Sequence, residues 1–313
     1  MAESRPVLVT GSNRSGTTWV GQMLCGSGEL EYLHEPFNPD IWPRLLDVRL
    51  GGHYTYVGPE NDAGFVQPMA DVLRYRFAVR SHLREVRSPK MAAKVAREQV
   101  RAVQRRRRSR RPLLKDPIAL FASEWLADRF DAQVVIMIRH PAAFASSIKR
   151  LAWPFNFGYL LQQPALLERY LSPWRAEIEA YAAHRPSPFE QSILLWRLFY
   201  GTVLQLKERR PDFSFVRHED LADDPVTGYA ALYDALGLHF DDAARRRIVD
   251  WSAEGNVTEV ASHELGTTRR DSRAAARTWR HRLTPEEVAR VREGVADVAP
   301  AFYGDETWLE AAG

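Results

Sequence analysis

Residues 6–24, PVLVTGSNRSGTTWVGQML, decide the fold. The apolar run 6–10 predicts a short strand, and the residues from Trp19 onward predict the start of a helix. Between them, Gly11 and Gly16 frame a loop in which glycines permit a tight turn. Backbone N–H groups in such a loop, together with the N-terminus of the next helix, surround a phosphate. We predict a phosphate-binding loop here, the alternative being an ordinary Gly/Ser loop that begins a helix.

The residues after Gly16 indicate which anion this loop binds. A loop that hydrolyses nucleotides has Lys followed by Ser or Thr at this point, where the hydroxyl holds Mg²⁺. This chain has Thr17 and Thr18 instead, and the nearest cation, Arg14, lies inside the loop. The best central strand, 133–139, ends in Arg139 rather than in a metal-binding Asp. We therefore expect an anion site without a metal ion.

Three later apolar runs, 112–115, 133–139 and 213–217, predict strands buried on both faces. Helical patterns separate them, and two helix starts are marked by a capping Ser or Thr followed by Pro and Glu, at 187–190 and 284–287. Alternation of strands and helices predicts an α/β fold with a parallel sheet covered by helices.

Composition limits the class of protein. The 313 residues are 45% hydrophobic and 27% charged, which suits one large core. We predict a single domain over 1–313, with a substrate-recognition insertion at about 36–111. The single cysteine, Cys25, excludes an intramolecular disulfide, and the N-terminal residues do not resemble a signal peptide. These features predict a cytoplasmic protein without a transmembrane segment, and the net charge of +3 favours anionic ligands.

A second anion signal follows the central strand. Arg139 ends this strand, at the edge where open α/β sheets bind their ligands. Ser147 follows in the first turns of the next predicted helix. Together the two side chains can hold one phosphate, although each alone is more often structural.

Five segments follow one another along the chain: RSGTTW (14–19), LLKDP (113–117), VVIMIRHPAAFASS (134–147), FVRHEDL (215–221) and TWRHRLT (278–284). In their order and roughly in their spacing they resemble the sulfotransferases that use 3′-phosphoadenosine 5′-phosphosulfate (PAPS). The resemblance implies the family's P-loop-like three-layer fold, with a central parallel sheet between helices. It also implies transfer of a sulfuryl group from PAPS to a hydroxyl, less readily an amine, of a carbohydrate, glycolipid or small natural product.

The resemblance also assigns residues to the donor. It implies that the loop holds the 5′-phosphosulfate, that Trp19 stacks on adenine, and that Arg139 and Ser147 bind the 3′-phosphate. His218 stands where many cytosolic members have Tyr. The family's late Arg-Lys-Gly triplet is missing, so a late arginine is expected in its place. The implied donor residues are Arg14, Ser15, Gly16, Thr17, Thr18, Trp19, Arg139, Ser147 and His218, with Arg270, Arg273 or Arg277 as the late arginine.

The catalytic base has three candidates. In the phenol-directed branch of the family, a His at the position of residue 117 is the base. This chain has Pro117 there, so a His base at this position is absent. Glu35, in YLHEPFNP, matches the carbohydrate-directed branch, and burial would raise its pKa into the range of a base. His34 and Asp116 are the alternatives. Lys115 is expected to bind the sulfuryl group or the acceptor, and Arg14 to stabilise the charge on the bridging oxygen.

Two further features carry weaker predictions. Residues 101–111 hold seven arginines, which suit a solvated helix end, an acidic membrane surface or an anionic acceptor. No nucleic-acid-binding motif surrounds the run, so nucleic acid is not an expected partner. The aromatic residues at 153–159 are either a lid over the acceptor or core. The competing functions are a P-loop kinase in which Lys115 replaces the loop lysine, and a non-catalytic anion- or nucleic-acid-binding module. Oligomeric state is not indicated.

Overall fold

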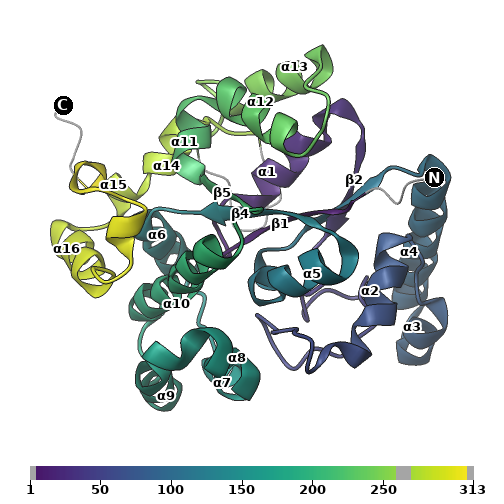
Figure 1. Ribbon diagram of the computed structural model, residues 1–313, viewed down its shortest axis with the longest axis horizontal. Coiled ribbons are helices and arrows are strands. Elements are labelled where there is room, and N and C mark those ends of the chain that lie inside the picture. The colour runs from purple at the N-terminus through teal and green to yellow at the C-terminus, as the bar shows by residue number, and fades with distance from the viewer. Residues whose placement is uncertain (1–4, 259–268, 309–313) are drawn as a thin grey trace.

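A five-stranded parallel sheet forms the centre of the molecule (Figure 1). The computed structural model describes residues 5–258 and 269–308. The strands lie in the order β2-β3-β1-β4-β5. Their bounds are β1 Val7–Gly11, β2 Leu30–His34, β3 Arg111–Lys115, β4 Gln133–Ile138 and β5 Ser214–Arg217. The α/β prediction with a parallel sheet is confirmed.

Strand β1 lies in the middle of the sheet. Leu8 pairs in register with Leu114 of β3 on one side and with Val134 of β4 on the other. Because all five strands run in parallel, their C-terminal ends share one edge of the sheet. The loop 12–16 therefore leaves the sheet at the centre of that edge.

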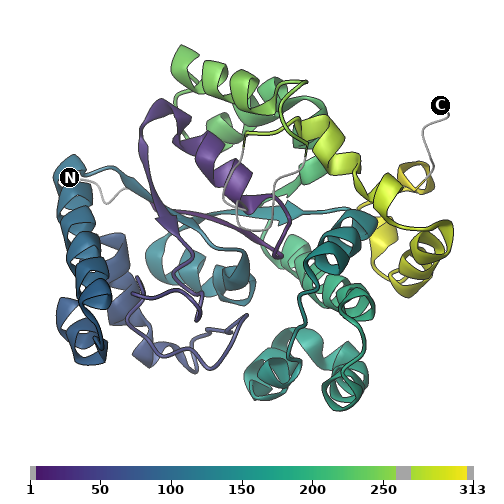
Figure 2. The ribbon, with the colours of Figure 1, turned by 180° about the vertical axis from the view of Figure 1, so that it is seen from behind.

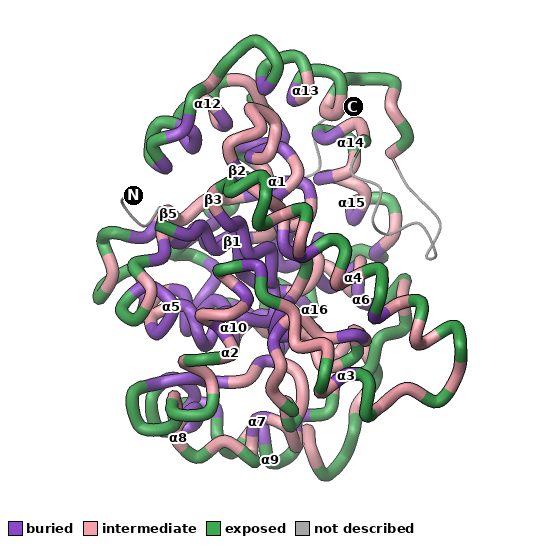
Figure 3. Tube along the Cα trace, turned by 90° about the vertical axis from the view of Figure 1, so that its right-hand side faces the viewer, coloured by how far each residue is buried: buried purple, intermediate pink, exposed green. Residues whose placement is uncertain are grey.

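Side chains alternate between two apolar cores, one on each face of the sheet. Leu8 and Ile136 belong to the core beneath helices α5, α6 and α10, and Val9 and Val135 belong to the core beneath α1, α12 and α13. Figures 1 and 2 show these two groups of helices on opposite sides of the sheet. The burial map in Figure 3 places the sheet in the buried centre of the molecule. The predicted three-layer arrangement is confirmed.

The helices that cover the two faces and their connections have the following bounds: α1 Thr17–Leu24, α5 Ser123–Phe130, α6 Pro141–Leu151, α7 Gly158–Leu161, α8 Pro164–Leu166, α9 Arg175–His184, α10 Pro188–Arg209, α11 His218–Asp223, α12 Pro225–Ala235, α13 Asp242–Ser252, α14 Ser272–Arg277, α15 Trp279–Arg282 and α16 Pro285–Gly294. The two helix starts read from the sequence are present. Ser187 accepts a hydrogen bond from the backbone N–H of Glu190, and Thr284 forms a reciprocal capping box with Glu287.

One strand differs from the sequence-based expectation. Strand β5 was predicted to be buried on both faces, but all four of its residues are only partly buried. It lies at the edge of the sheet, with β4 as its strand partner. An edge strand has a neighbouring strand on one side only, and no residue of β5 is fully buried. That prediction was wrong.

The segment between β2 and β3 contains helices α2 Val66–Leu73, α3 Val79–Glu85 and α4 Pro89–Arg108. Part of the arginine run lies at the C-terminal end of α4. Arg105 and Arg108 lie 3.5 and 3.6 Å from the carboxylate of Glu31 on β2, and Arg111 donates to the backbone oxygen of Leu236. Several of these arginines thus attach α4 and β3 to their neighbours. Treating 1–313 as one domain with an insertion at 36–111 stays a prediction.

Candidate functional site

A cavity of about 660 Å³ lies at the C-terminal edge of the sheet. Residues at or just after the C-terminal ends of all five strands line this cavity. In the order of the strands across the sheet, these are Glu35 after β2, Lys115 at the end of β3, the loop 12–16 after β1, Arg139 after β4 and His218 after β5.

The loop between β1 and α1 has the geometry of an anion cradle. Gly16 has φ +95°, and a Cβ atom there would lie 2.3 Å from Nδ1 of His218. Arg14 also has a positive φ, of 68°. Ser15 points away from the cavity, because it is fully buried and its hydroxyl donates to the carbonyl of Ser12 at 2.7 Å. Of the predicted loop residues, Arg14, Gly16, Thr17 and Thr18 line the cavity and Ser15 closes the turn.

Two buried tyrosines hold this loop, and the sequence analysis did not single them out. The hydroxyl of Tyr200 on α10 is 2.8 Å from Oγ of Ser12 and accepts a hydrogen bond from the backbone N–H of Arg139 at 3.0 Å. The hydroxyl of Tyr54 accepts from the backbone N–H of Asn13 at 3.1 Å. Tyr200 thus ties the loop after β1 directly to the end of β4.

Five arginines line one end of the cavity: Arg14, Arg139, Arg150, Arg270 and Arg282. Burial, and then the positive charge of the other four, lowers the pKa of the Arg14 guanidinium to about 10. Mutual repulsion of this kind raises the energy of the cluster unless an anion lies among the charges. This end of the cavity therefore concentrates positive charge, with the Glu219 carboxylate as a counter-ion of Arg139.

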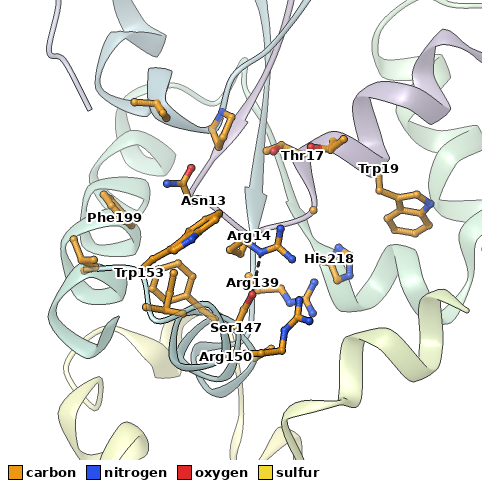
Figure 4. A pocket seen from close by; sticks show the side chains of 18 of the residues that line it. Asn13, Arg14, Thr17, Trp19, Arg139, Ser147, Arg150, Trp153, Phe199 and His218 are labelled. Atoms are coloured by element: carbon orange, nitrogen blue, oxygen red, sulfur yellow. Dashed lines mark hydrogen bonds between the residues drawn. The ribbon is translucent and has the colours of Figure 1, made fainter. Parts of the chain in front are cut away.

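Arg14 and Ser147 meet within this cluster. Nε of Arg14 donates to Oγ of Ser147 at 2.9 Å (Figure 4). Arg139 is oriented by Glu219, whose carboxylate oxygen is 3.5 Å from Nε of Arg139. The predicted pair Arg139 and Ser147 thus lies together beside the loop. Arg150, one helical turn after Ser147 on α6, joins them, and its i, i+3 spacing was the missed sequence signal.

In Figure 4, His218 and Trp19 lie on the opposite side of Arg14 from Trp153 and Phe199. The rings of His218 and Trp19 meet edge to face at a centroid distance of 5.4 Å. Burial, and then the charges of Arg139 and Arg270, hold the pKa of His218 well below its ordinary value, so the imidazole is neutral. Its buried Nδ1 has no hydrogen-bond partner within residues 5–258 and 269–308. Trp19 lines the cavity but is only 7% exposed, since it also packs against Tyr229.

The three late arginines separate into two groups. Arg270 lines the cavity. Arg277 instead forms an ion pair of 2.8 Å with Asp223 at the end of α11, and Arg273 donates to the backbone oxygen of the same residue. Arg282, in the segment TWRHRLT, lines the cavity although it was not singled out.

Glu35 lies at the opposite end of the cavity. Its backbone has φ 46°, and its side chain accepts hydrogen bonds from Lys115 Nζ and, at 2.6 Å, from the Asn38 amide. Burial acts to raise the pKa of this carboxyl group, but the charge and hydrogen bond of Lys115, followed by His34 and Asn38, hold the pKa below its ordinary value. The expected rise in the pKa of Glu35 was wrong, because the sequence could not reveal that Lys115 is its direct partner.

The other two candidate bases differ in access. The His34 side chain is 54% exposed and Nε2 lies 4.0 Å from Glu35; burial and then Lys115 lower its pKa. Asp116 is fully buried and does not line the cavity. Its carboxylate accepts hydrogen bonds from the backbone N–H groups of Phe37 and Ile118, and burial raises its pKa to about 7. Asp116 therefore positions the turn after Glu35.

The aromatic residues after α6 divide between lid and core. Trp153 is 40% exposed and lines the cavity with Phe155, whereas Phe157 is 1% exposed and belongs to the core. Tyr159 packs over Gly52 beside His53. The lid and core interpretations each describe part of the segment.

Residues 6–242 match the profile of the Sulfotransferase family. The chain belongs to the sulfotransferase family. Among curated relatives, carbohydrate sulfotransferase 1 of Rattus norvegicus is 33% identical over 34% of this chain and 32% of the relative, and the Homo sapiens protein matches at the same identity and coverage. The match spans about a third of the length of these relatives.

A solved structure supports the fold of this sulfotransferase. The sulfotransferase domain of the Synechococcus PCC 7002 olefin synthase aligns with a TM-score of 0.51 at 18% identity, covering 97% of this chain and 98% of that domain. Within residues 5–258 and 269–308, no helix is both long and apolar enough to cross a membrane. The same residues contain no group of three or more His, Cys, Asp or Glu placed to hold a metal ion. A cytoplasmic location stays a prediction.

Proposed function

We propose that this sulfotransferase moves the sulfuryl group of PAPS to an acceptor hydroxyl, with Glu35 as the base. The observation that carries the proposal is the arginine cluster around the loop 12–16, in a member of the sulfotransferase family. A donor with separate anionic groups fits this end of the cavity, since a guanidinium group gains from an anion beside it.

The donor groups divide between two elements in this proposal. Loop N–H groups and Arg14 hold the 5′-phosphosulfate, because the loop opens helix α1 and helix N-termini attract anions. Arg139 and Ser147 hold the 3′-phosphate, with Arg270 in the role of the late arginine. The imidazole edge of His218 and the indole ring of Trp19 form the boundary of the space for the nucleoside. Arg273 and Arg277 are not included, because both are engaged with Asp223.

The chemical step requires a proton acceptor and a means of stabilising the leaving group. Glu35 accepts the proton of the acceptor hydroxyl as the new oxygen–sulfur bond forms, and the electron pair of the broken bond passes to the departing phosphate. Lys115 and Arg14 stabilise the negative charge that develops there. The lowered pKa means that Glu35 is ionised at neutral pH and is a weaker base than an ordinary glutamate, because Lys115 stabilises its charge. His34 remains the second candidate base.

Calorimetric titration with adenosine 3′,5′-bisphosphate (PAP), without magnesium, tests the proposal. We expect binding that Arg139→Ala weakens and Arg277→Ala leaves unchanged. Binding of Mg-ATP without any binding of PAP would refute the proposal and favour the kinase alternative. An acceptor in the broad class of carbohydrates, glycolipids or small natural products is part of the proposal. Contact with a membrane surface through the arginines of α4 stays a prediction.

A further inference from the structure

Charge is divided between the two ends of the cavity. Neighbouring strands lie about 4.8 Å apart, so the ends of β2 and β4, three strands apart, are separated by roughly 14 Å. Glu35 follows β2 and Arg139 follows β4. Glu35 and Arg139 thus lie toward opposite sides of one cavity, and Lys115 and Arg14 lie at or just after the ends of the two strands between them.

The end of the cavity at β2 carries a second carboxylate. Asp40 lines the cavity five residues after Glu35, and its side chain is 75% exposed. His53 lies 3.0 Å from it. Lys115, at the end of β3, also lines the cavity. Its side chain is 1% exposed and forms an ion pair with Glu35. At this end of the cavity Lys115 therefore offsets the charge of Glu35, and Asp40 is the exposed carboxylate that an entering molecule meets.

Apolar side chains form the wall between the two ends. Tyr54 stacks on Phe199 at a centroid distance of 4.3 Å and meets Phe155 edge to face at 6.0 Å. Figure 4 shows Phe199 and Trp153 near Asn13, on the side of Arg14 away from His218 and Trp19. The wall is composed of Pro117, Ile118, Trp153, Pro154, Phe155, Leu195 and Phe199. It offers area to an apolar ring or chain and few hydrogen bonds to a polyhydroxylated sugar.

From this division we infer that the acceptor is an uncharged hydroxyl compound with an apolar ring or chain, rather than a sulfated or phosphorylated glycan. The inference rests on the proposed function, because the donor must occupy the arginine end. An anionic group on the acceptor placed beside Asp40 would be repelled by that carboxylate and would lose its water against the apolar wall. An apolar body gains from burial there, and the hydroxyl reaches Glu35.

Two acceptors with the same ring and the same hydroxyl test the inference: 2-naphthol and its anionic analogue 6-hydroxynaphthalene-2-sulfonate. Radiolabelled sulfuryl transfer from PAPS is measured with both and with an extract of the producing cell. We expect 2-naphthol to have the higher kcat/KM and the label from the extract to enter butanol-soluble products. Preference for the sulfonate, or label confined to multiply charged glycans, would overturn the inference.

Variants connect the result to the wall and to the charge. Trp153→Ala is expected to raise KM for 2-naphthol about tenfold, a typical effect of one apolar contact, without changing the affinity for PAP. Leu83→Ala, on α3, is the control, because Leu83 is a 53% exposed apolar side chain that does not line the cavity, and it should change neither value. Asp40→Lys should reduce the difference in kcat/KM between 2-naphthol and 6-hydroxynaphthalene-2-sulfonate. An unchanged preference in Asp40→Lys and an unchanged KM in Trp153→Ala would contradict the inference.

PAP binding separates the two levels of failure. If PAP binds and only anionic acceptors are used, the inference fails and the proposed function stands. If PAP does not bind, the proposed function itself fails. PAP binding without transfer to any acceptor counts against both.

Discussion

Two adjacent serines on α6 provide a matched test of the donor site. Oγ of Ser147 accepts a hydrogen bond of 2.9 Å from the Arg14 guanidinium, whereas the buried Oγ of Ser146 has no hydrogen-bond partner in the described parts of the chain. In the proposed function the Ser147 hydroxyl binds the 3′-phosphate of PAP, and a hydrogen bond to a charged group contributes about 1.5–3 kcal/mol. Since 1.4 kcal/mol is tenfold in affinity, Ser147→Ala should raise the Kd for PAP by roughly 10- to 100-fold.

Calorimetry on both variants measures the effect, and thermal unfolding reports their stability. Ser146→Ala removes a buried hydroxyl that has no partner, so its affinity should equal that of the wild type and its Tm should be equal or higher. The reasoning fails if the two substitutions weaken PAP binding equally, because the effect would then come from packing of α6 and not from the contact of Ser147 with the 3′-phosphate. It also fails if Ser147→Ala binds PAP as tightly as the wild type.

Three further perturbations address the loop, the base and the turn behind it. Gly16→Ala should abolish PAP binding in calorimetry while the protein stays folded by circular dichroism, because the new Cβ meets His218 and a positive φ costs about 1–3 kcal/mol; retained affinity would contradict the loop geometry. Glu35→Gln should lower kcat by about 10²- to 10⁴-fold at unchanged PAP affinity, and a larger loss in His34→Gln would move the base to His34. Burial raises the pKa of Asp116 from 3.8 to about 7, so the folded state holds this proton more tightly than the unfolded state, and the contribution of the group to stability is lost as pH rises from about 4 to 7. Asp116→Asn should remove that fall in Tm relative to the wild type, and an identical pH dependence of Tm in both proteins would show that the carboxyl group is ionised in the fold.

The central part of the fold could be predicted from short apolar runs bounded by glycine or arginine. Strands β1 and β4 are buried in the middle of the sheet, so their composition alone marks them. The burial of strand β5 was predicted wrongly. Its apolar sequence resembles that of a central strand, but it lies at the edge of the sheet and is only partly buried. The order of the strands in the sheet, β2-β3-β1-β4-β5, depends on contacts between segments distant in sequence, and no local pattern encodes it.

The site was predictable where a motif is contiguous and unpredictable where contacts are distant in sequence. Arg14, Arg139 and Ser147 were found through their motifs, and the structure brings them together. Tyr200 carries no local signal, since a tyrosine in an apolar helix is indistinguishable from core. The direction of the Glu35 pKa was missed because it depends on Lys115, which lies 80 residues away in the chain.

The hydroxyl of Tyr200 has a consequence for how this protein could change over evolution. By joining Ser12 to the backbone of Arg139, it braces the donor half of the cavity from helix α10, behind the sheet. The opposite half is formed by the loops after β2 and α6, and α10 contacts these loops through Phe199 and Gln191, which meet Tyr54 and the backbone N–H of Phe155. Acceptor preference could still diverge through exposed side chains such as Asp40 and Trp153, while the nucleotide half keeps its shape. A single buried tyrosine would in this way allow the two halves of the reaction to be selected separately.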